Sequence, residues 1–343
     1  MRLVTFEAIG RAGGPARAGA LIDGDTGVVD LQAAFAGRYG APSPDLASVL
    51  AIAEGGPEAL GRAAQAVATA ARSHVVARDG VRLLAPIPRP PQMRDFLCFE
   101  KHLVQAFQQL RVMRASESAD PAAAMAEMER DGSLAVPKAW YERPIFYHPN
   151  RLNVVGHDHD VVWPAYSARM DYELEFGAYI GRGGRDIGKA DARDHIFGYT
   201  IFNDFSARDE QTKDMPGQLG PGKGKDFDGG NVMGPCLVTA DELTDPYDLT
   251  MIVRVNGEER GRGHSGEMAW RFEDCIAHAS RSETLEPGEF LGSGTVGDGC
   301  GVEHMRFLEP GDVVELEVER IGVLRNRIVR RDDGAARAGG RTP

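Results

Sequence analysis

Two glutamates separated by a single residue lie in an apolar segment of the sequence. Glu173 and Glu175 belong to the stretch Met170–Ile180, in which acidic and apolar residues alternate before an apolar run. This alternation predicts a β-strand, on which residues i and i+2 share one face. Neighbouring carboxylates repel each other, so they need water, a basic residue or a metal cation. A solvated strand face is one interpretation, but the apolar run Ala178–Ile180 favours burial and a bound cation.

Two further acids supply candidate oxygen ligands. The apolar stretch 197–202 runs into Asn203 and Asp204, which places Asp204 at the end of a predicted strand, where ligands commonly lie. Asp95 lies in the segment Met93–His102. A cluster of carboxylate oxygens favours a hard divalent cation over zinc. Mg²⁺ is the expected ion, with Mn²⁺ and Ca²⁺ as alternatives.

The elements that carry these acids predict a mostly β, α+β fold. The 42 glycines and 20 prolines in 343 residues are typical of a chain with many short strands and turns. Expected strands include 161–163, 173–180, 249–255 and 313–318.

The chain is expected to divide into a small and a large domain. The N-terminal part has a hairpin turn at Gly24–Asp25 and an alanine-rich helix over Pro57–Arg72. A proline cluster over 86–91 then indicates a linker. The expected divisions are a small β-rich domain over 1–85, a catalytic domain over 86–330 and a disordered tail over 331–343.

A histidine lies on a predicted helix shortly after Asp95. The stretch Phe99–Leu110 has helical character and contains His102. An imidazole can take a proton from water near neutral pH, although a lone histidine on a helix is more often structural or solvated. Downstream, Asp120–Pro121 predicts a helix start within the polar segment 114–135, which could be a lid or a plain surface helix.

Charge and composition exclude several classes of function. The net charge of −12 argues against a nucleic-acid binder and against binding at an anionic membrane surface. No apolar run approaches the roughly 20 residues that span a bilayer. The four cysteines form no CxxC pair, and the N-terminus resembles a strand rather than a signal peptide, so a reduced, cytoplasmic protein is expected.

The order of several short strings resembles the fumarylacetoacetate hydrolase superfamily over residues 90–328. The resemblance implies a mixed β-sandwich roll like the C-terminal domain of fumarylacetoacetase, a small SH3-like N-terminal domain and a homodimer. The matching strings include Asp171–Glu175, His195–Tyr199, Asn203–Asp209, Gly224–Phe227, Gly234–Pro235, Val255–Glu258, Gly292–Thr295, Leu308–Asp312 and Ile321–Asn326.

The resemblance also implies roles for individual residues. A divalent metal would be held by Asp95, Glu173, Glu175 and Asp204. The general base would be His102, seven residues after Asp95, and Glu303 would orient it. Lys225 and Gln211 correspond to residues that polarise the carbonyl under attack. The residues assigned to substrate binding are Arg111, Tyr147 and Thr295.

Two departures from the family pattern predict a different substrate pocket. A tyrosine expected two residues after Asp95 is Leu97, and another expected four residues after Gln211 is missing, with Met215 at that place. The expected activity is hydrolysis of a carbon–carbon bond in a small 1,3-dicarbonyl acid, such as an acylpyruvate. The alternatives are a decarboxylase, hydratase or isomerase of a 2-oxo acid, and a binding module whose metal is structural.

Overall fold

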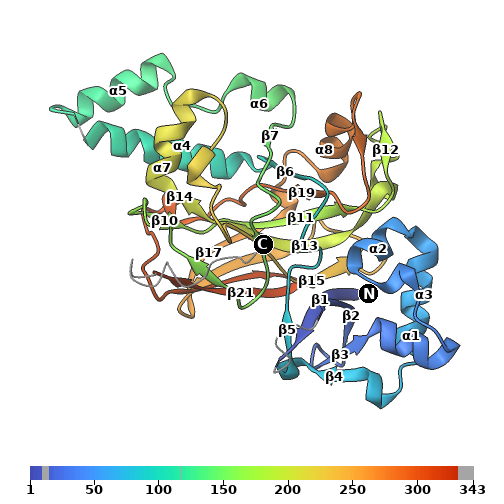
Figure 1. Cartoon of the computed structure of the whole chain (residues 1–343). Helices are drawn as coiled ribbons and strands as arrows, with labels where there is room; N and C mark the ends of the chain where they lie inside the picture. The colour runs from blue at the N-terminus through green and yellow to red at the C-terminus, as the bar shows by residue number, and fades with distance from the viewer. Residues whose placement is uncertain (10–14, 117, 331–343) are drawn as a thin grey trace.

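The computed structural model describes residues 1–9, 15–116 and 118–330, and its largest element is a mixed sheet (Figure 1). The strands of this sheet are β1 (Arg2–Ala8), β2 (Arg17–Ile22), β3 (Gly27–Asp30), β4 (Val75–Ala77), β5 (Val81–Leu83), β6 (Met93–Phe96), β7 (Phe146–Tyr147), β8 (Val154–Val155), β11 (Leu174–Ile180), β13 (Ile196–Asp204), β15 (Asn231–Thr239) and β19 (Phe290–Gly292). Their order is β4-β3-β2-β1-β15-β13-β11-β19-β6-β7, with β5 beside β1 and β8 beside β15.

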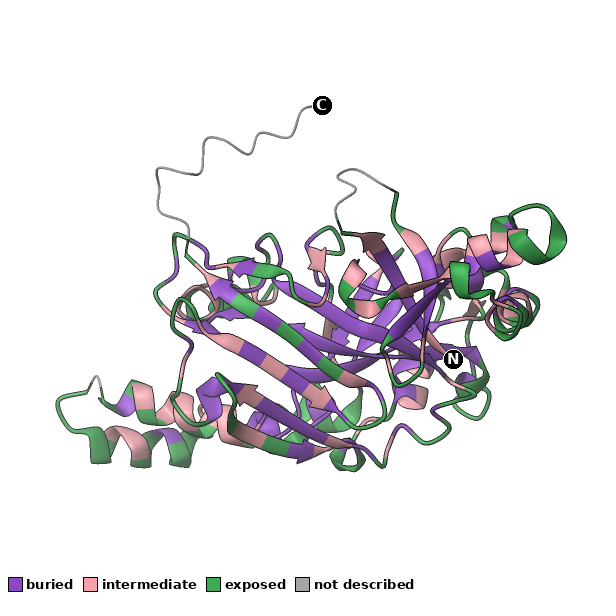
Figure 2. Cartoon of the chain, turned by 90° about the horizontal axis from the view of Figure 1, so that it is seen from below, coloured by how far each residue is buried: buried purple, intermediate pink, exposed green. Residues whose placement is uncertain are grey.

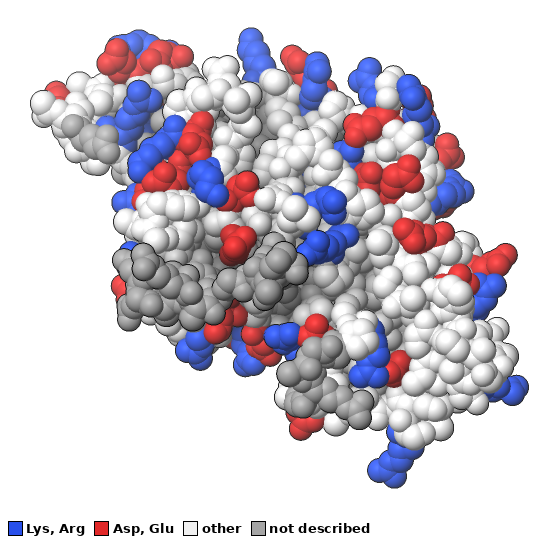
Figure 3. Space-filling view, in the orientation of Figure 1, with Lys and Arg blue, Asp and Glu red and all other residues white. Residues whose placement is uncertain are grey.

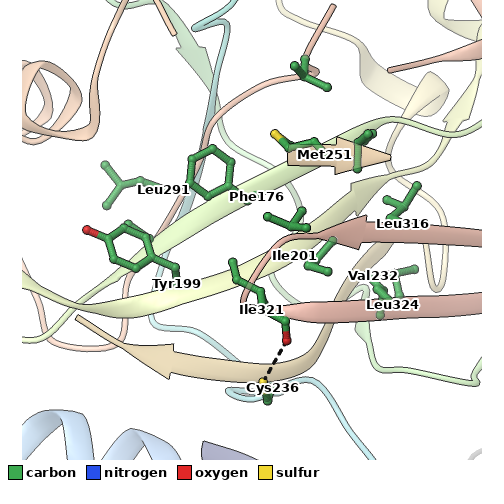
Figure 4. Packing of buried hydrophobic residues seen from close by; sticks show 14 of the residues in the cluster. Phe176, Tyr199, Ile201, Val232, Cys236, Met251, Leu291, Leu316, Ile321 and Leu324 are labelled. Carbon is green, nitrogen blue, oxygen red and sulfur yellow. Dashed lines mark hydrogen bonds between the residues drawn. The ribbon is translucent and has the colours of Figure 1, made fainter. Parts of the chain in front are cut away.

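A second, five-stranded sheet packs on the central strands of the first. It has the order β17-β16-β20-β21-β9, and side chains of both sheets share one core (Figure 4). On β21 exposed residues alternate with buried ones, as expected when one face is covered and the other is solvated (Figure 2). The strands of this sheet are β9 (Asp160–Val162), β16 (Thr250–Val255), β17 (Glu258–His264), β20 (Val313–Val318) and β21 (Gly322–Val329).

The central strands are buried on both faces. Along β11, Ala178 contributes to the core between the two sheets, whereas Tyr179 contributes to a second core that includes the N-terminal helices. Ile201 and Phe202 on β13 are divided in the same way. Alternate residues of a strand therefore pack into two different hydrophobic cores. Since both faces of these strands are covered, acidic side chains on them are buried.

Two groups of helices lie at opposite ends of the molecule (Figure 1). Three helices near the N-terminus lie beside β1–β4, and the hairpin of α4 and α5 projects from the opposite end. Asp30 caps α1 and Asp120 caps α5. The helices are α1 (Leu31–Tyr39), α2 (Val49–Glu54), α3 (Gly56–Ala68), α4 (Glu100–Ser116), α5 (Pro121–Asp131), α6 (Lys138–Glu142), α7 (Arg208–Asp214) and α8 (Phe272–Ala279).

The remaining strands form two short two-stranded sheets. They pair β10 (Met170–Asp171) with β14 (Ser206–Ala207) and β12 (Gly184–Arg185) with β18 (Thr284–Leu285). The strand expected to be continuous over Met170–Ile180 is therefore interrupted. At the interruption Glu173 forms an isolated bridge with Cys300, and its backbone N–H donates to Asn203 Oδ1. At this point the backbone of Glu173 is therefore bound to a side chain instead of to a neighbouring strand backbone on β13.

The N-terminal strands continue the main sheet. Leu3 on β1 is paired with Leu237 on β15, and Leu3 packs in the same core as Tyr179 of β11. An SH3-like unit is not confirmed by this arrangement, and the division at residue 85 stays a prediction. The predicted tail over 331–343 lies outside the described residues.

The expected architecture and two of the expected elements are confirmed. The β-rich α+β architecture is present, as are the helix beginning after Asp120 and the strand over Leu174–Ile180. All four cysteines are buried free thiols. Within the described ranges, no helix combines the length and hydrophobicity needed to cross a bilayer. In the view of Figure 3, positive and negative side chains are interspersed over the described surface.

Candidate metal centre

Three buried carboxylates from three strands meet at one end of the main sheet. Glu175 on β11 is opposite Phe202 on β13, two residues before Asp204, so Glu175 and Asp204 share a face. On the other side, β19 pairs with β11 and places Gly292 opposite Asp95 of β6. As a result, oxygen atoms of Asp95, Glu175 and Asp204 all lie within 4.8 Å of one another.

Gly292 leaves the space that the Asp95 carboxylate occupies. A β-carbon at Gly292 would lie 2.3 Å from Asp95 Oδ1, a distance that no side chain could keep. The same oxygen accepts a hydrogen bond of 3.3 Å from the backbone N–H of Gly294. Gly292 at the end of β19 therefore leaves room for this acid, and Gly294 in the following loop orients it.

Burial and mutual repulsion make the charged form of this cluster unfavourable without a cation. Burial, followed by the charge of Asp204, raises the pKa of Asp95 well above its ordinary value. Burial, followed by the charge of Asp95, does the same to the pKa of Glu175, and burial also raises the pKa of Asp204. Glu175 Oε2 and Asp204 Oδ1 are buried without a hydrogen-bond partner. Three carboxylates with unpartnered oxygens fit a hard divalent cation.

Glu173 has a different environment from the other three acids. Lys225 Nζ lies 2.5 Å from its Oε2, and Arg208 Nη2 lies 2.8 Å from its Oε1. Burial alone would raise the pKa of Glu173, but the charges of Lys225 and Arg208 outweigh it and lower the pKa to about 2. Both oxygens are therefore held by cations in this structure, and its expected role as a metal ligand stays a prediction.

Lys225 links Glu173 to Asp204. Its ammonium group donates to Glu173 Oε2, to Asp204 Oδ2 at 2.6 Å and to the Asp204 backbone carbonyl at 3.0 Å. These contacts occupy all three of its N–H donors. Burial opposes the charge of Lys225, but the carboxylates of Asp204 and Glu173 prevail and raise its pKa. Lys225 thus remains an ammonium ion that neutralises part of the cluster.

Tyr147 also contacts a proposed ligand. Its hydroxyl donates to Asp204 Oδ2 at 2.6 Å. Burial, followed by the charge of Asp204, raises the pKa of Tyr147 well above its usual value, so the hydroxyl stays protonated as a donor. Since Tyr147 and Lys225 share Oδ2, they leave Asp204 Oδ1 available for a metal ion.

The predicted base and its predicted partner are in contact. His102 Nδ1 lies 2.9 Å from Glu303 Oε1, and both side chains are buried. The other oxygen of Glu303 accepts from the backbone N–H of Cys300 at 2.9 Å. A carboxylate at Nδ1 places the ring proton there and leaves Nε2 as the basic nitrogen. Cys300 also forms the isolated bridge with Glu173, which brings the His102–Glu303 pair next to the acidic residues.

Helix α4 is fastened to the loop that carries Glu303. Lys101 Nζ lies 2.7 Å from Asp298 Oδ2, and Gln105 Nε2 donates to Asp298 Oδ1 at 2.6 Å. These two helix residues flank His102 along α4, so the contact between His102 and Glu303 is supported on both sides.

The remaining predicted residues fall into two groups. Thr295 Oγ1 donates to Glu175 Oε1 at 3.3 Å, and Gln211 Oε1 accepts from Arg208 Nη1 at 2.9 Å, so both belong to the network around the acids. Arg111 instead donates to the Leu134 carbonyl after α5. It follows His102 by nine residues, which at about 100° per residue brings it to the opposite face of α4. Its role in substrate binding stays a prediction.

Sequence reasoning assigned no role to Arg208 or Asp171, although both lie in the quoted strings. Arg208 Nε donates to Asp171 Oδ2 at 2.8 Å, and the same carboxylate accepts from the backbone N–H groups of Gly301 and Val302. Asp171 therefore ties the Glu303 loop to Arg208 and, through it, to Glu173. The available signal was electrostatic, since four buried acids require positive partners.

Comparisons with known proteins agree with this geometry. The family model for the fumarylacetoacetate (FAA) hydrolase C-terminal domain matches residues 111–329. The human protein named "Oxaloacetate tautomerase FAHD2A, mitochondrial" is 33% identical over 264 residues, covering 76% of this chain and 74% of its own length. The Xenopus laevis protein named "Oxaloacetate tautomerase fahd2, mitochondrial" is 32% identical over 258 residues, covering 75% of this chain and 71% of its own length.

Solved structures extend the likeness to nearly the whole chain. The fumarylacetoacetate hydrolase of Exiguobacterium antarcticum has a TM-score of 0.71 at 27% identity, over 96% of this chain and 100% of its own. Maleylpyruvate hydrolase from Sphingobium sp. SYK-6, in complex with manganese(II) and pyruvate, shares the fold. Its TM-score is 0.68 at 22% identity, over 97% of this chain and 100% of its own. The chain therefore belongs to the fumarylacetoacetate hydrolase family.

Proposed function

We propose that this protein is a divalent-metal hydrolase that cleaves a carbon–carbon bond in a small 1,3-dicarbonyl acid, such as an acylpyruvate or a fumarylacetoacetate-like compound. The observation that carries the proposal is the contact between His102 and Glu303 beside the buried Asp95–Glu175–Asp204 cluster. A positioned base next to a cation site supplies both requirements of a metal-assisted hydrolysis. We further propose that the protein acts as a homodimer.

The three carboxylates would hold the metal. Asp95, Glu175 and Asp204 offer oxygen ligands of the kind that Mg²⁺, Mn²⁺ and Ca²⁺ prefer, and Mg²⁺ is the ion we expect. A bound divalent cation would supply Lewis acidity that favours the enolate form of an oxo acid.

His102 would act as the general base. Its Nε2 accepts a proton from water, and the hydroxide adds to the carbonyl carbon of the substrate. The carbon–carbon bond then breaks, its electron pair passes to the enolate fragment, and the proton on Nε2 returns to the enolate carbon. Glu303 at Nδ1 fixes the orientation of the ring and stabilises the imidazolium between these two proton transfers.

Lys225 and Gln211 would stabilise the oxyanion that forms during the addition. The contact from Lys225 Nζ to the Asp204 carbonyl is the longest of its three, so it is the one that a substrate oxygen would replace. A donor of this kind typically contributes about 2.7–4 kcal/mol to the transition state.

A second candidate is keto–enol tautomerisation of oxaloacetate. It is favoured by the similarity to the two relatives that carry this activity in their names. The same His102 could move a proton between carbon and the enol oxygen without any attack by water. Tautomerisation needs a base and a stabilised enolate, and it leaves every carbon–carbon bond intact.

Product analysis separates the two candidates. Purified protein is incubated with acetylpyruvate or oxaloacetate, with Mg²⁺ or with EDTA, while enol absorbance and released pyruvate are measured together. Hydrolysis predicts Mg²⁺-dependent formation of one pyruvate for each acetylpyruvate consumed. Loss of the oxaloacetate enol without cleavage of any acylpyruvate would replace the proposed function with the tautomerase.

A further inference from the structure

Three donor atoms of different chemistry meet beside the carboxylate cluster. They are His102 Nδ1, Cys300 Sγ and Glu303 Oε1. Nδ1 lies 2.9 Å from the carboxylate oxygen and 3.8 Å from the sulfur, and the three side chains are buried. The mechanism uses the histidine and the glutamate, but it gives the thiol of Cys300 no task.

The two separations from His102 Nδ1 bracket the edge length of a tetrahedral zinc site, and all three donor atoms lie within 4.8 Å of one another. With Zn–N and Zn–O bonds of about 2.0–2.2 Å and a Zn–S bond of about 2.3 Å, tetrahedral angles place neighbouring ligand atoms roughly 3.3–3.6 Å apart. The observed 2.9 and 3.8 Å lie on either side of that range. Small side-chain rotations would therefore bring the three atoms to one ion, and water would complete the coordination.

The donor types distinguish this group from the Asp95–Glu175–Asp204 cluster. Three carboxylates suit a hard cation, whereas an imidazole, a thiolate and one carboxylate suit zinc. Two neighbouring groups with contrasting donors could therefore take different ions. The space beside His102 must admit water and substrate if the proposed function holds, so a small hydrated cation can also reach it.

We propose that His102, Cys300 and Glu303 form a second metal site that binds Zn²⁺ and inhibits the enzyme. Binding displaces the thiol proton of Cys300 to solvent and replaces the hydrogen bond between His102 and Glu303. The ring proton moves from Nδ1 to Nε2 as Nδ1 becomes a ligand. Nε2 is then a donor and cannot accept a proton from water, so the base is lost. Inhibition and the access of the cation rest on the proposed function, whereas the donor geometry does not.

The binding test uses cobalt as a probe, because Co²⁺ takes zinc sites and absorbs light when bound to thiolate. Wild-type protein saturated with Mg²⁺ is titrated with Co²⁺ and then with Zn²⁺. A thiolate-to-cobalt charge-transfer band, removed by one equivalent of Zn²⁺, is expected in the wild type and absent in Cys300→Ala. Cys236→Ala is the matched control, because Cys236 is also a buried thiol but donates to the Ile321 carbonyl. A band that survives in Cys300→Ala overturns the proposal.

The inhibition test compares the ratio of turnover with and without Zn²⁺ within each variant, at several Mg²⁺ concentrations. Cys300→Ala is expected to raise the half-inhibitory Zn²⁺ concentration about 10-fold or more, and Cys236→Ala is expected to leave it unchanged. Inhibition that is relieved by Mg²⁺ but not by Cys300→Ala would place the zinc among the carboxylates and contradict the inference. If no substrate turns over, the proposed function fails, while the cobalt band still decides whether the site exists.

Discussion

Glu303 Oε1 lies 2.9 Å from His102 Nδ1, although the two residues are 201 positions apart in the chain. The contact joins α4 to the loop that follows β19, and the same loop supplies Thr295 beside Glu175. The base, its orienting carboxylate and one part of the acidic cluster are therefore fixed by a single loop. A change at Glu303 should therefore affect proton transfer, and a change at Thr295 should affect the metal centre.

Replacement of the base tests proton transfer. His102→Ala is expected to lower kcat by about 10²–10⁴-fold, because a positioned general base contributes that much. KM and Mg²⁺ affinity should stay nearly constant, since His102 lies outside the carboxylate cluster. Glu303→Gln should cost less, because the base itself remains in place. Steady-state kinetics and calorimetric Mg²⁺ titration give these values, and equal kcat in wild type and His102→Ala would make His102 structural.

The sequence predicted the buried acids of this site but not the ion pairs that some of them form. The alternation over Met170–Ile180 indicated buried acids, and Glu175 is buried as expected. Nothing in that stretch could show that Glu173 meets Lys225 and Arg208, because these cations come from distant segments. Contacts between segments depend on strand register and loop paths, which local pattern does not encode.

The N-terminal region shows the same limit. Its strands and its helix were predictable from alternation and alanine content, and α3 lies within the expected helix except for its first residue. The pairing of β1 with β15 was not predictable, because the local sequence of a strand does not identify a partner that lies far away in the chain. The resemblance to the family located Asp95 and His102, which composition and periodicity alone left open.

The space left by Gly292 should be required for metal binding. In Gly292→Ala the new β-carbon would lie 2.3 Å from Asp95 Oδ1, so the carboxylate must move out of the cluster. We expect Mg²⁺ or Mn²⁺ affinity to fall by about 10-fold or more. Gly61→Ala is the control, because no atom lies within 4 Å of that β-carbon. Unchanged affinity in isothermal titration of Gly292→Ala would show that Asp95 is not a ligand.

Glu173 should stabilise the fold even without metal. Glu173→Gln removes a charge that pairs with Lys225 and Arg208, whose side chains are nearly inaccessible to solvent. Lys225 keeps Asp204 and Arg208 keeps Asp171, so the cost should lie below the roughly 3–5 kcal/mol of a buried charge left with no partner, at about 1–3 kcal/mol. Unfolding in denaturant with EDTA should show a loss of this order. A loss that appears only when Mg²⁺ is present would instead identify Glu173 as a metal ligand.

The metal-free fold should be less stable as pH rises. The folded-state pKa values of Asp95, Glu175 and Asp204 are raised, so the folded state binds more protons than the unfolded chain. Their contribution to stability is fully present below the ordinary carboxyl pKa of about 4 and is lost as pH rises through the raised values.

Thermal unfolding between about pH 5 and pH 8 measures this effect. In EDTA, Tm should fall across this range more in the wild type than in Glu175→Gln, which removes one of the titrating groups. Mg²⁺ competes with protons for the same oxygens, so the gain in Tm on adding Mg²⁺ should grow with pH. A gain in Tm that is independent of pH would show that these carboxylates do not bind the metal.

Anomalous diffraction from crystals soaked in Mn²⁺ tests the metal centre most directly. The account predicts one strong manganese peak, with oxygens of Asp95, Glu175 and Asp204 at about 2.0–2.6 Å. Glu175 Oε2 and Asp204 Oδ1, which have no partner now, should be among the ligands. A peak elsewhere, or full Mn²⁺ occupancy with these three side chains turned away from it, would contradict the account.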